Sequence, residues 1–355
     1  MRTQPLFALS LALMAALPTA HAQSLRLEGR FGLKPPVASH GESDDFARQQ
    51  RARGEGRQAR NDRDSSTDLS TLAKRTGGTS TSPTLQSWMS TDVAGAWAAG
   101  YKGAGATMLF VDDFRSTQYL SGNLGTGNKV LRHGDWTSLE GSMIAPSATL
   151  KKQDFNTTSA IALATTGLNV VNLSYAMYAA AGYSASQIGW SAKEQSIIAA
   201  AQNGKAVISK AAGNDAIAVG GTNASGKVDY LNLALKGGVT TLFVGALSTN
   251  GTTTSPATLA SYSNYAGADT TVQNQFLVVG VEGSKTGLYG TSFAAPVITG
   301  YAAILGSKFK TATPTQITNQ LLNTARQDTI RNYSSAIHGR GEASLSRALA
   351  PVSVQ

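Results

Sequence analysis

Ser292 stands in a setting that is typical of a nucleophile. Residues 290–296 read GTSFAAP, so this serine follows a Gly-Thr pair and precedes a run of small residues that ends in proline. A serine that attacks a carbonyl carbon needs a tight approach and a following helix whose first amide groups face developing negative charge. It also needs a base, a carboxylate that orients the base, and a donor for the oxyanion. The stretch predicts acyl-transfer chemistry if the chain supplies these three partners.

The base can be chosen by elimination among four histidines. His21 lies in a predicted signal peptide, His40 in a polar N-terminal segment, and His338 in a Gly-rich turn near the C-terminus. His133 remains and is predicted to be the general base. The 355 residues include no cysteine, which excludes thiolate nucleophiles, disulfides and cysteine-based metal sites. The covalent chemistry must therefore be oxygen chemistry.

Apolar runs alternate with helical patterns from about residue 85 onward. Strands are expected at 106–112, 168–174, 206–212, 240–247 and 276–281, and helices at 91–99, 159–166, 185–203, 292–309 and 315–326. Continuous apolar strands separated by helices predict an α/β fold, with a doubly wound, mainly parallel sheet that has helices on both faces. Working residues in such a sheet gather at the carboxyl ends of the strands.

The candidate side chains satisfy that rule. Asp112 and Asp113 end the first strand, Ser174 ends the second, and Gly213 and Asn214 follow the third. Either aspartate can be the carboxylate that orients the base, because both stand at the strand end. Position at the strand end alone leaves this choice open.

Four stretches resemble the subtilases, the subtilisin-like serine peptidases. GTSFAAPVITG at 290–300 resembles the family's serine signature, GAGATMLFVDD at 103–113 its strand into the catalytic aspartate, LRHGDW its His-Gly opening, and SKAAGND at 209–215 its oxyanion turn. The chain order Asp, His, Ser is also the family's. The resemblance implies that Asp112, His133 and Ser292 form a catalytic triad and that Asn214 binds the oxyanion.

The resemblance also implies residues that bind substrate. VVNLSYA at 170–176 looks like the family's strand that pairs with substrate backbone beside the first specificity pocket, which suggests contacts from Ser174, Tyr175 and Gly213. For Ser174, plain sheet packing is an equal alternative.

Two departures from the family pattern bear on activity. Asp113-Phe114 replaces the usual Ser or Thr followed by Gly, and Asp135-Trp136 replaces Thr-His after the His-Gly pair. Phe lacks the backbone freedom of Gly, so the turn after Asp112 and the placement of Asp112 are expected to depend on other contacts than in the family. Only about a dozen residues follow His133 before the next strand, which predicts a short helix and leaves no room for the calcium loop of many relatives. The sequence identifies no certain cofactor, and it allows a structural calcium ion without indicating its ligands.

Three functions fit these residues. The first is a secreted serine endopeptidase that hydrolyses peptide bonds through an acyl-enzyme. The second is a catalytically impaired or self-processing subtilase-like protein that binds a partner in its cleft. The third passes the same acyl-enzyme to an amine or alcohol instead of water. The presence of all four chemical residues favours the first.

The N-terminal part is expected to differ from the rest. Residues 1–22 form a predicted secretory signal peptide, in which an apolar run of about 12 residues is shorter than the roughly 20 that span a bilayer. Cleavage near Ala22 predicts a secreted or periplasmic protein. Residues 23–84 are polar and low in complexity and predict a disordered linker or a degenerate pro-segment. Residues 85–355 are the predicted peptidase domain.

The charge pattern predicts the partners. The formal net charge is +9, but the basic residues are spread among acidic ones and lack interleaved aromatics. This favours a solvated basic surface over a nucleic-acid site. We expect a monomer whose partner is a protein or peptide substrate.

Overall fold

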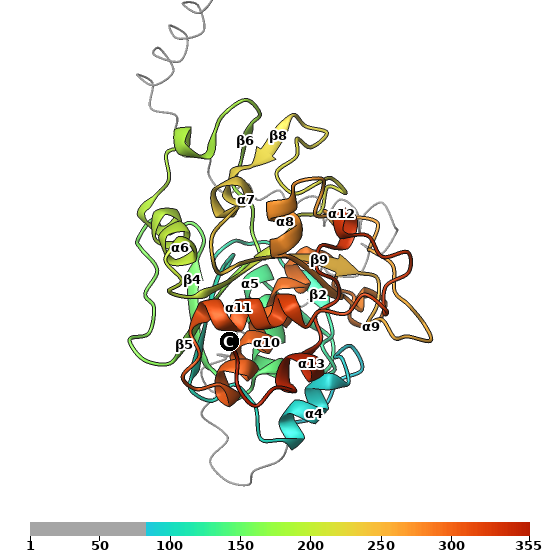
Figure 1. The fold of residues 1–355 in the computed structure, drawn as a ribbon. Coiled ribbons are helices and arrows are strands. Elements are labelled where there is room, and N and C mark those ends of the chain that lie inside the picture. Colours follow the sequence, from blue (N-terminus) through green and yellow to red (C-terminus); the bar gives the residue numbers. More distant parts are fainter. Residues whose placement is uncertain (1–82) are drawn as a thin grey trace, which may run out of the picture.

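A six-stranded sheet forms the centre of the computed structural model, which describes residues 83–355 (Figure 1). The order across the sheet is β10 (Phe276–Gly280), β9 (Thr241–Leu247), β7 (Val207–Ala211), β5 (Leu168–Leu173), β1 (Ala106–Asp112) and β4 (Thr149–Asp154). All neighbouring strands in it are parallel. The predicted signal peptide and nearly all of the 23–84 segment lie outside the described residues.

All five predicted strands are confirmed within one or two residues. The structure adds β4, whose sequence TLKKQD did not indicate a strand because most of its side chains are exposed or half-buried. It pairs with β1 alone and forms one edge of the sheet. Lys151 and Lys152 on this edge hinder pairing with another chain, since a lysine cannot easily be buried in a sheet interface.

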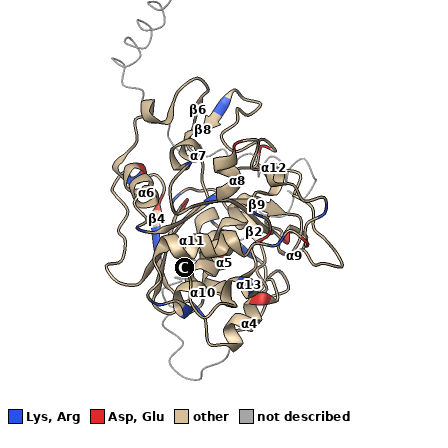
Figure 2. Ribbon diagram, viewed as in Figure 1, with Lys and Arg blue, Asp and Glu red and all other residues tan. Residues whose placement is uncertain are grey.

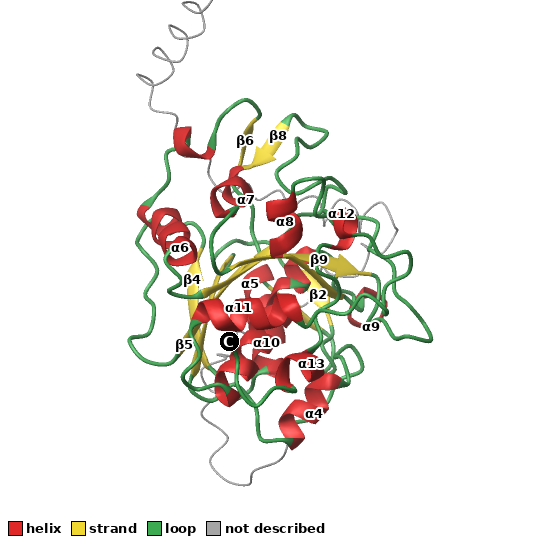
Figure 3. Cartoon of the chain, viewed as in Figure 1, coloured by secondary structure: helices red, strands yellow, loops and turns green. Residues whose placement is uncertain are grey.

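Helices cover both faces of the sheet, as predicted (Figures 1 and 3). One face carries α4 (Asp92–Ala98), α5 (His133–Ile144), α10 (Ala295–Lys308), α11 (Pro314–Asn323) and α13 (Leu345–Leu349). The other carries α6 (Ala192–Gln202), α7 (Tyr230–Leu235), α8 (Thr270–Gln275) and α12 (Ser335–His338). Each face has its own cluster of buried apolar side chains, so the strands are buried on both sides, and their continuous apolar runs follow from that.

One predicted helix is wrong, and another is shorter than expected. Residues 159–166 form no helix, because their backbone groups bond elsewhere: the Ile161 amide donates to Ser196 Oγ at 3.0 Å, and Ala164 exchanges two bonds with the Asn169 side chain at 2.7 and 2.9 Å. The helix expected at 185–203 is a short 3-10 turn, η1 (Ala185–Gln187), followed by α6. Ser191 caps α6 through its side chain, which fixes the later start.

The remaining helices agree with prediction. Residues 91–99 contain α4, 315–326 contain most of α11, and 292–309 contain α10, which follows the 3-10 turn η2 (Thr291–Phe293). The helix after the candidate histidine is indeed short, since α5 has 12 residues.

Two small antiparallel sheets lie beside the main one. β2 (Leu120–Gly122) pairs with β3 (Lys129–Leu131), and this hairpin leads into α5. β6 (Tyr178–Ala180) follows β5 and pairs with β8 (Lys227–Asp229), which leads into α7. A further short helix, α9 (Gly283–Thr286), precedes η2.

The charged residues are distributed over many elements, and Figure 2 shows acidic and basic positions scattered along the ribbon. The absence of nucleic-acid binding stays a prediction. Within residues 83–355, no helix has the length and apolarity needed to cross a membrane.

Candidate active site

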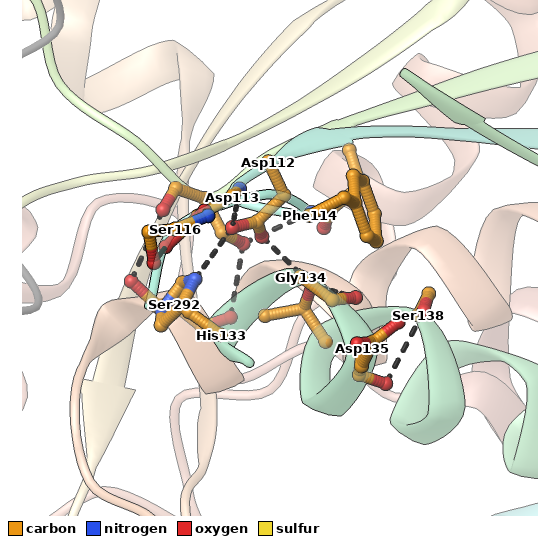
Figure 4. A network of polar contacts seen from close by, with 12 residues as sticks. Asp112, Asp113, Phe114, Ser116, His133, Gly134, Asp135, Ser138 and Ser292 are labelled. Atoms are coloured by element: carbon orange, nitrogen blue, oxygen red, sulfur yellow. Dashed lines mark hydrogen bonds and ion pairs between the residues drawn. The ribbon is translucent and has the colours of Figure 1, made fainter. Parts of the chain in front are cut away.

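The end of β1 meets the start of α5, and this junction joins a carboxylate to an imidazole. Asp112 Oδ1 lies 2.6 Å from His133 Nδ1, and both side chains are buried (Figure 4). Burial makes this charge-assisted hydrogen bond stronger than the same contact in water. Because Nδ1 faces the carboxylate, it carries the proton in the neutral ring, and Nε2 is left as the acceptor.

The structure decides between the two aspartates. Asp113 does not face the imidazole. Its Oδ1 accepts the amides of Arg115 at 3.2 Å and Ser116 at 2.9 Å, and its Oδ2 accepts the Ser116 hydroxyl. Asp113 therefore closes its own turn, and the carboxylate beside His133 is Asp112.

Phe114 does not need the backbone freedom that glycine has at this position in the family. It is not among the described non-glycine residues with positive φ, and its amide donates to Asp154 Oδ2 at 3.0 Å. Lys152 Nζ lies 5.1 Å from the centre of its ring and 2.9 Å from Asp135 Oδ1. A Cβ on Gly134 would approach Phe114 to 2.7 Å, so glycine is required next to this ring.

The second altered residue, Trp136, also has a structural partner. Its side chain is fully buried, and its Nε1 donates to the carbonyl of Leu120 in β2 at 2.8 Å. This bond ties the β2–β3 hairpin to α5. The departures from the family pattern around Asp112 and His133 are thus accommodated by contacts of their own.

Ser292 lies in η2, which contacts α5, and Figure 4 shows it beside His133. The ring of the next residue, Phe293, is 5.7 Å from the His133 ring, centre to centre. The Ser292 carbonyl accepts the hydroxyl of Ser174 at 3.0 Å, and the Ser292 hydroxyl lies 3.4 Å from the Ser174 carbonyl. The end of β5 therefore supports the serine from one side, and α10 begins on the other.

Asn214 is held by Thr291, the residue before the serine. Its Oδ1 accepts the Thr291 amide at 2.8 Å and the Thr291 hydroxyl at 2.9 Å. Because both of these groups are donors, the carbonyl oxygen of the Asn214 amide must face them, and the Nδ2 donors face away. The side chain thus has one orientation, with its N–H groups on the side opposite Thr291.

Gly213 supports the same turn. Its φ is 112°, and a Cβ there would lie 2.3 Å from Asn264 Nδ2, so only glycine fits. Its amide donates to the Thr291 hydroxyl at 3.0 Å, and its carbonyl accepts the Asn264 amide at 2.8 Å. Thr291 Oγ1 therefore joins the turn at 213–214 to the serine's own segment.

The two other predicted substrate residues are oriented differently. The hydroxyl of Ser174 is occupied within the protein, because it also accepts Asn172 Nδ2 at 2.9 Å. The Tyr175 side chain points to the opposite face, where its ring packs on Phe155 and its hydroxyl donates to Glu194 Oε1 at 3.3 Å. Burial and the nearby Glu194 carboxylate raise the pKa of Tyr175. The Tyr175 side chain is therefore buried and bonded within the protein, and its contact with a substrate stays a prediction.

A buried ion pair that was not predicted from the sequence lies next to this turn. Lys210 Nζ lies 3.1 Å from Asp229 Oδ2 and 2.6 Å from the Ala211 carbonyl. Asp229 Oδ1 accepts the Met177 amide at 2.9 Å, so the pair links the end of β7 and the segment just before β6 to the start of α7. The signal in the sequence is the lysine itself, which interrupts the apolar run AVISKAA and requires a counter-charge if it is buried.

Thr137 is a second residue of the candidate site that was not predicted from the sequence. It lies one turn after His133 in α5, and its hydroxyl is 2.7 Å from Asp112 Oδ2. The spacing of four residues, which places two side chains on one helix face, was the available signal.

The structure also bears on the calcium ion and on His338, the histidine near the C-terminus. No group of three or more His, Cys, Asp and Glu side chains that suits a metal ion occurs among residues 83–355. His338 is buried, with Nδ1 at 3.2 Å from the Ser334 carbonyl and its ring stacked on Tyr333. Burial lowers the pKa of His338.

Comparison with solved structures finds subtilisin-like proteases of low sequence identity. The prenylagaramide maturation protease PagA is 17% identical, with a TM-score of 0.48 over 73% of this chain and 98% of that chain. MycP1 from Mycobacterium smegmatis is 18% identical, with a TM-score of 0.44 over 73% and 82%. A cold-adapted subtilisin-like serine proteinase is 18% identical, with a TM-score of 0.42 over 69% and 88%.

Sequence comparison places the chain in a family. No curated protein is similar enough in sequence to match. The model of the subtilase family matches residues 90–341, which is more than half of the chain. The chain therefore belongs to the subtilase family, the serine endopeptidases whose sequence features and parallel sheet it shares.

Proposed function

We propose that the protein is a secreted serine endopeptidase that hydrolyses peptide bonds with an Asp112–His133–Ser292 triad. The observation that carries this proposal is the 2.6 Å bond between Asp112 and His133 Nδ1. It leaves Nε2 as the base at the edge of the sheet where η2 carries Ser292. None of the three side chains is exposed, as an acyl transfer shielded from bulk water requires.

The reaction would proceed in two halves. Ser292 Oγ attacks the peptide carbonyl carbon while His133 Nε2 takes its proton, and Asp112 stabilises the imidazolium that forms. The tetrahedral intermediate then expels the amine, which receives the proton from His133, and an acyl-enzyme remains. A water molecule, deprotonated by His133, attacks the ester and releases the acid and free Ser292.

Asn214 is proposed to bind the oxyanion, together with the backbone amide of Ser292. Support comes from the fixed orientation of its amide, whose Oδ1 is held by two donors of Thr291. A donor that does not reorganise during the reaction is most effective. Loss of such an asparagine in a member of this family costs about 10²–10³ in kcat.

The substrates are proposed to be proteins or peptides outside the cytoplasm. Secretion rests on the sequence of residues 1–22 alone, which lie outside the described residues. The contacts made by Phe114, Asp135 and Trp136 support an active enzyme over a partner-binding relative, because the altered motifs keep Asp112 and His133 bonded to each other.

Covalent labelling tests the proposal. The purified protein is treated with a fluorophosphonate probe at pH values between about 6 and 9, and the modified peptide is identified by mass spectrometry. We expect modification of Ser292, its loss in Ser292→Ala, and its retention in Ser307→Ala. Ser307 is a matched control because it is a buried serine of α10 whose hydroxyl caps the Ile304 carbonyl at 2.7 Å. Absence of labelling at every pH would overturn the proposal.

A further inference from the structure

Helix α5 brings two side chains to the same carboxylate. His133 and Thr137 are four residues apart in α5 and therefore lie on one face of it. His133 Nδ1 meets Asp112 Oδ1, and Thr137 Oγ1 lies 2.7 Å from the other oxygen, Oδ2. The Thr137 side chain has no exposed surface, so water does not compete for this bond.

The Thr137 hydroxyl has one proton and two acceptors within reach. Gly134 O is 3.2 Å away, as expected for a threonine that bonds back to its own helix, but Asp112 Oδ2 is 0.5 Å closer and is charged. Hydrogen bonds to ionised acceptors are shorter and about twice as strong as neutral ones. The proton is therefore assigned to the carboxylate.

Both oxygens of the carboxylate are thereby constrained. Asp112 Oδ1 accepts His133 Nδ1 and the Asp113 amide at 2.7 Å, and Oδ2 accepts Thr137. Donors on both oxygens oppose rotation of the carboxylate about its Cβ–Cγ bond. Because the imidazole follows the carboxylate, its plane and its Nδ1 proton are held as well.

The residue after Asp112 cannot provide this hydroxyl. Asp113 is an acceptor when ionised, and both of its oxygens are directed to Arg115 and Ser116. The Asp113 side chain is committed to its own turn, and the hydroxyl that Asp112 Oδ2 accepts comes from α5 instead.

We infer that Thr137 is a positioning residue of the triad, which holds Asp112 through Oδ2 and so orients His133 toward Ser292. The inference rests on the proposed function. It assigns to Thr137 an effect on the rate of acyl transfer rather than on substrate binding, since its hydroxyl is turned to Asp112 inside the protein.

The test compares Thr137→Val, which keeps the shape and removes the hydroxyl, with Thr137→Ser, which keeps the hydroxyl. Ser138→Ala is the control, because Ser138 is the next residue of α5, is equally buried, and donates only to the Asp135 carbonyl at 3.2 Å among its bonds within the described residues. Thr137→Ala serves as a second variant without the hydroxyl if Thr137→Val does not fold. Melting temperatures are measured for all variants.

Steady-state hydrolysis of a peptide ester gives the first readout. We expect kcat to fall about tenfold in Thr137→Val, with KM changed by less than about twofold, and to remain near the parent value in Thr137→Ser and Ser138→Ala. A fall confined to kcat, and rescue by serine, distinguish positioning from a general loss of structure.

A second readout does not require turnover. The proton between His133 Nδ1 and Asp112 gives a strongly downfield ¹H NMR resonance when it is held in a short hydrogen bond. We expect Thr137→Val to shift or broaden this resonance, whereas Thr137→Ser and Ser138→Ala leave it in place. An unchanged resonance together with an unchanged kcat in Thr137→Val would overturn the inference. If the parent protein itself is not labelled by the fluorophosphonate, the proposed function fails, and the resonance alone still decides whether Thr137 holds the pair.

Discussion

The buried ion pair beside the candidate oxyanion turn gives a prediction whose size can be worked out from the structure. The side chains of Lys210 and Asp229 are 0% and 7% exposed, and their charged atoms are 3.1 Å apart. Lys210→Met removes the cation but keeps most of the apolar volume. Asp229 then remains as a buried carboxylate whose bonds to the Met177 and Leu231 amides cannot replace a full positive charge.

Removal of one partner of a buried pair costs about 3–5 kcal/mol. For a folded part of this size, about 1 kcal/mol corresponds to about 2–3 °C, so the melting temperature should fall by about 6–15 °C. The double variant Lys210→Met with Asp229→Asn should recover most of that loss, because asparagine keeps an acceptor for both amides and carries no charge.

The assay is thermal and urea unfolding of the parent, both single variants and the double variant. Lys236→Met is the matched control, since Lys236 is 3.0 Å from Asp269 but the two side chains are 41% and 43% exposed. An exposed pair contributes less than about 1 kcal/mol. The reasoning is refuted if Lys210→Met costs no more than Lys236→Met, or if the double variant is no more stable than Lys210→Met.

Three further predictions concern the turn, a buried acid and the N-terminal segment. Thr291→Val should lower kcat about tenfold or more at nearly constant KM. The substitution leaves the Gly213 amide without its acceptor and removes one of the two donors that hold Asn214. Equal kcat values in Thr291→Val and the parent would contradict this. Burial raises the pKa of Glu140 well above 4.5, and its Oε2 has no hydrogen-bond partner among residues 83–355. The folded protein therefore holds this proton more tightly than the unfolded chain, and the free energy of unfolding should fall as pH rises from 4.5 through the raised pKa. Glu140→Gln should remove this dependence of stability on pH and should be about 1–2 kcal/mol more stable than the parent at neutral pH. Urea unfolding at several pH values checks this. A variant less stable than the parent at neutral pH would count against the prediction. Limited proteolysis should remove residues 23–82 and leave 83–355 with an unchanged melting temperature, since few of the removed residues are apolar enough to join a core; a lower melting temperature would show that the segment supports the fold.

The sequence was informative where local pattern and long-range structure agree. The runs at 106–112 and 276–281 are mostly apolar, since their strands are buried on both faces, and the predicted bounds agree with the structure within a residue. The edge strand β4 was missed because most of its side chains are exposed or half-buried, so its sequence lacks a continuous apolar run. The helix expected at 159–166 was wrong because two side chains bond to the backbone of that segment instead: Asn169, five residues after Ala164, and Ser196, 35 residues after Ile161.

In the candidate site, too, some features could be predicted from the sequence and others only from the structure. Residue type, chain order and position at strand ends nominate His133 and Ser292 as candidates, because few residues can serve as base or nucleophile and parallel strands bring their carboxyl ends together. The choice between Asp112 and Asp113, the orientation of Asn214 and the contact from Thr137 depended on directions of side chains that adjacent positions in a sequence do not specify. Those directions are set by packing of β1, α5 and η2 against one another. The candidate residues and the chemistry proposed for them could therefore be predicted from the sequence, whereas the bonding partners of each candidate atom were decided only by the tertiary structure.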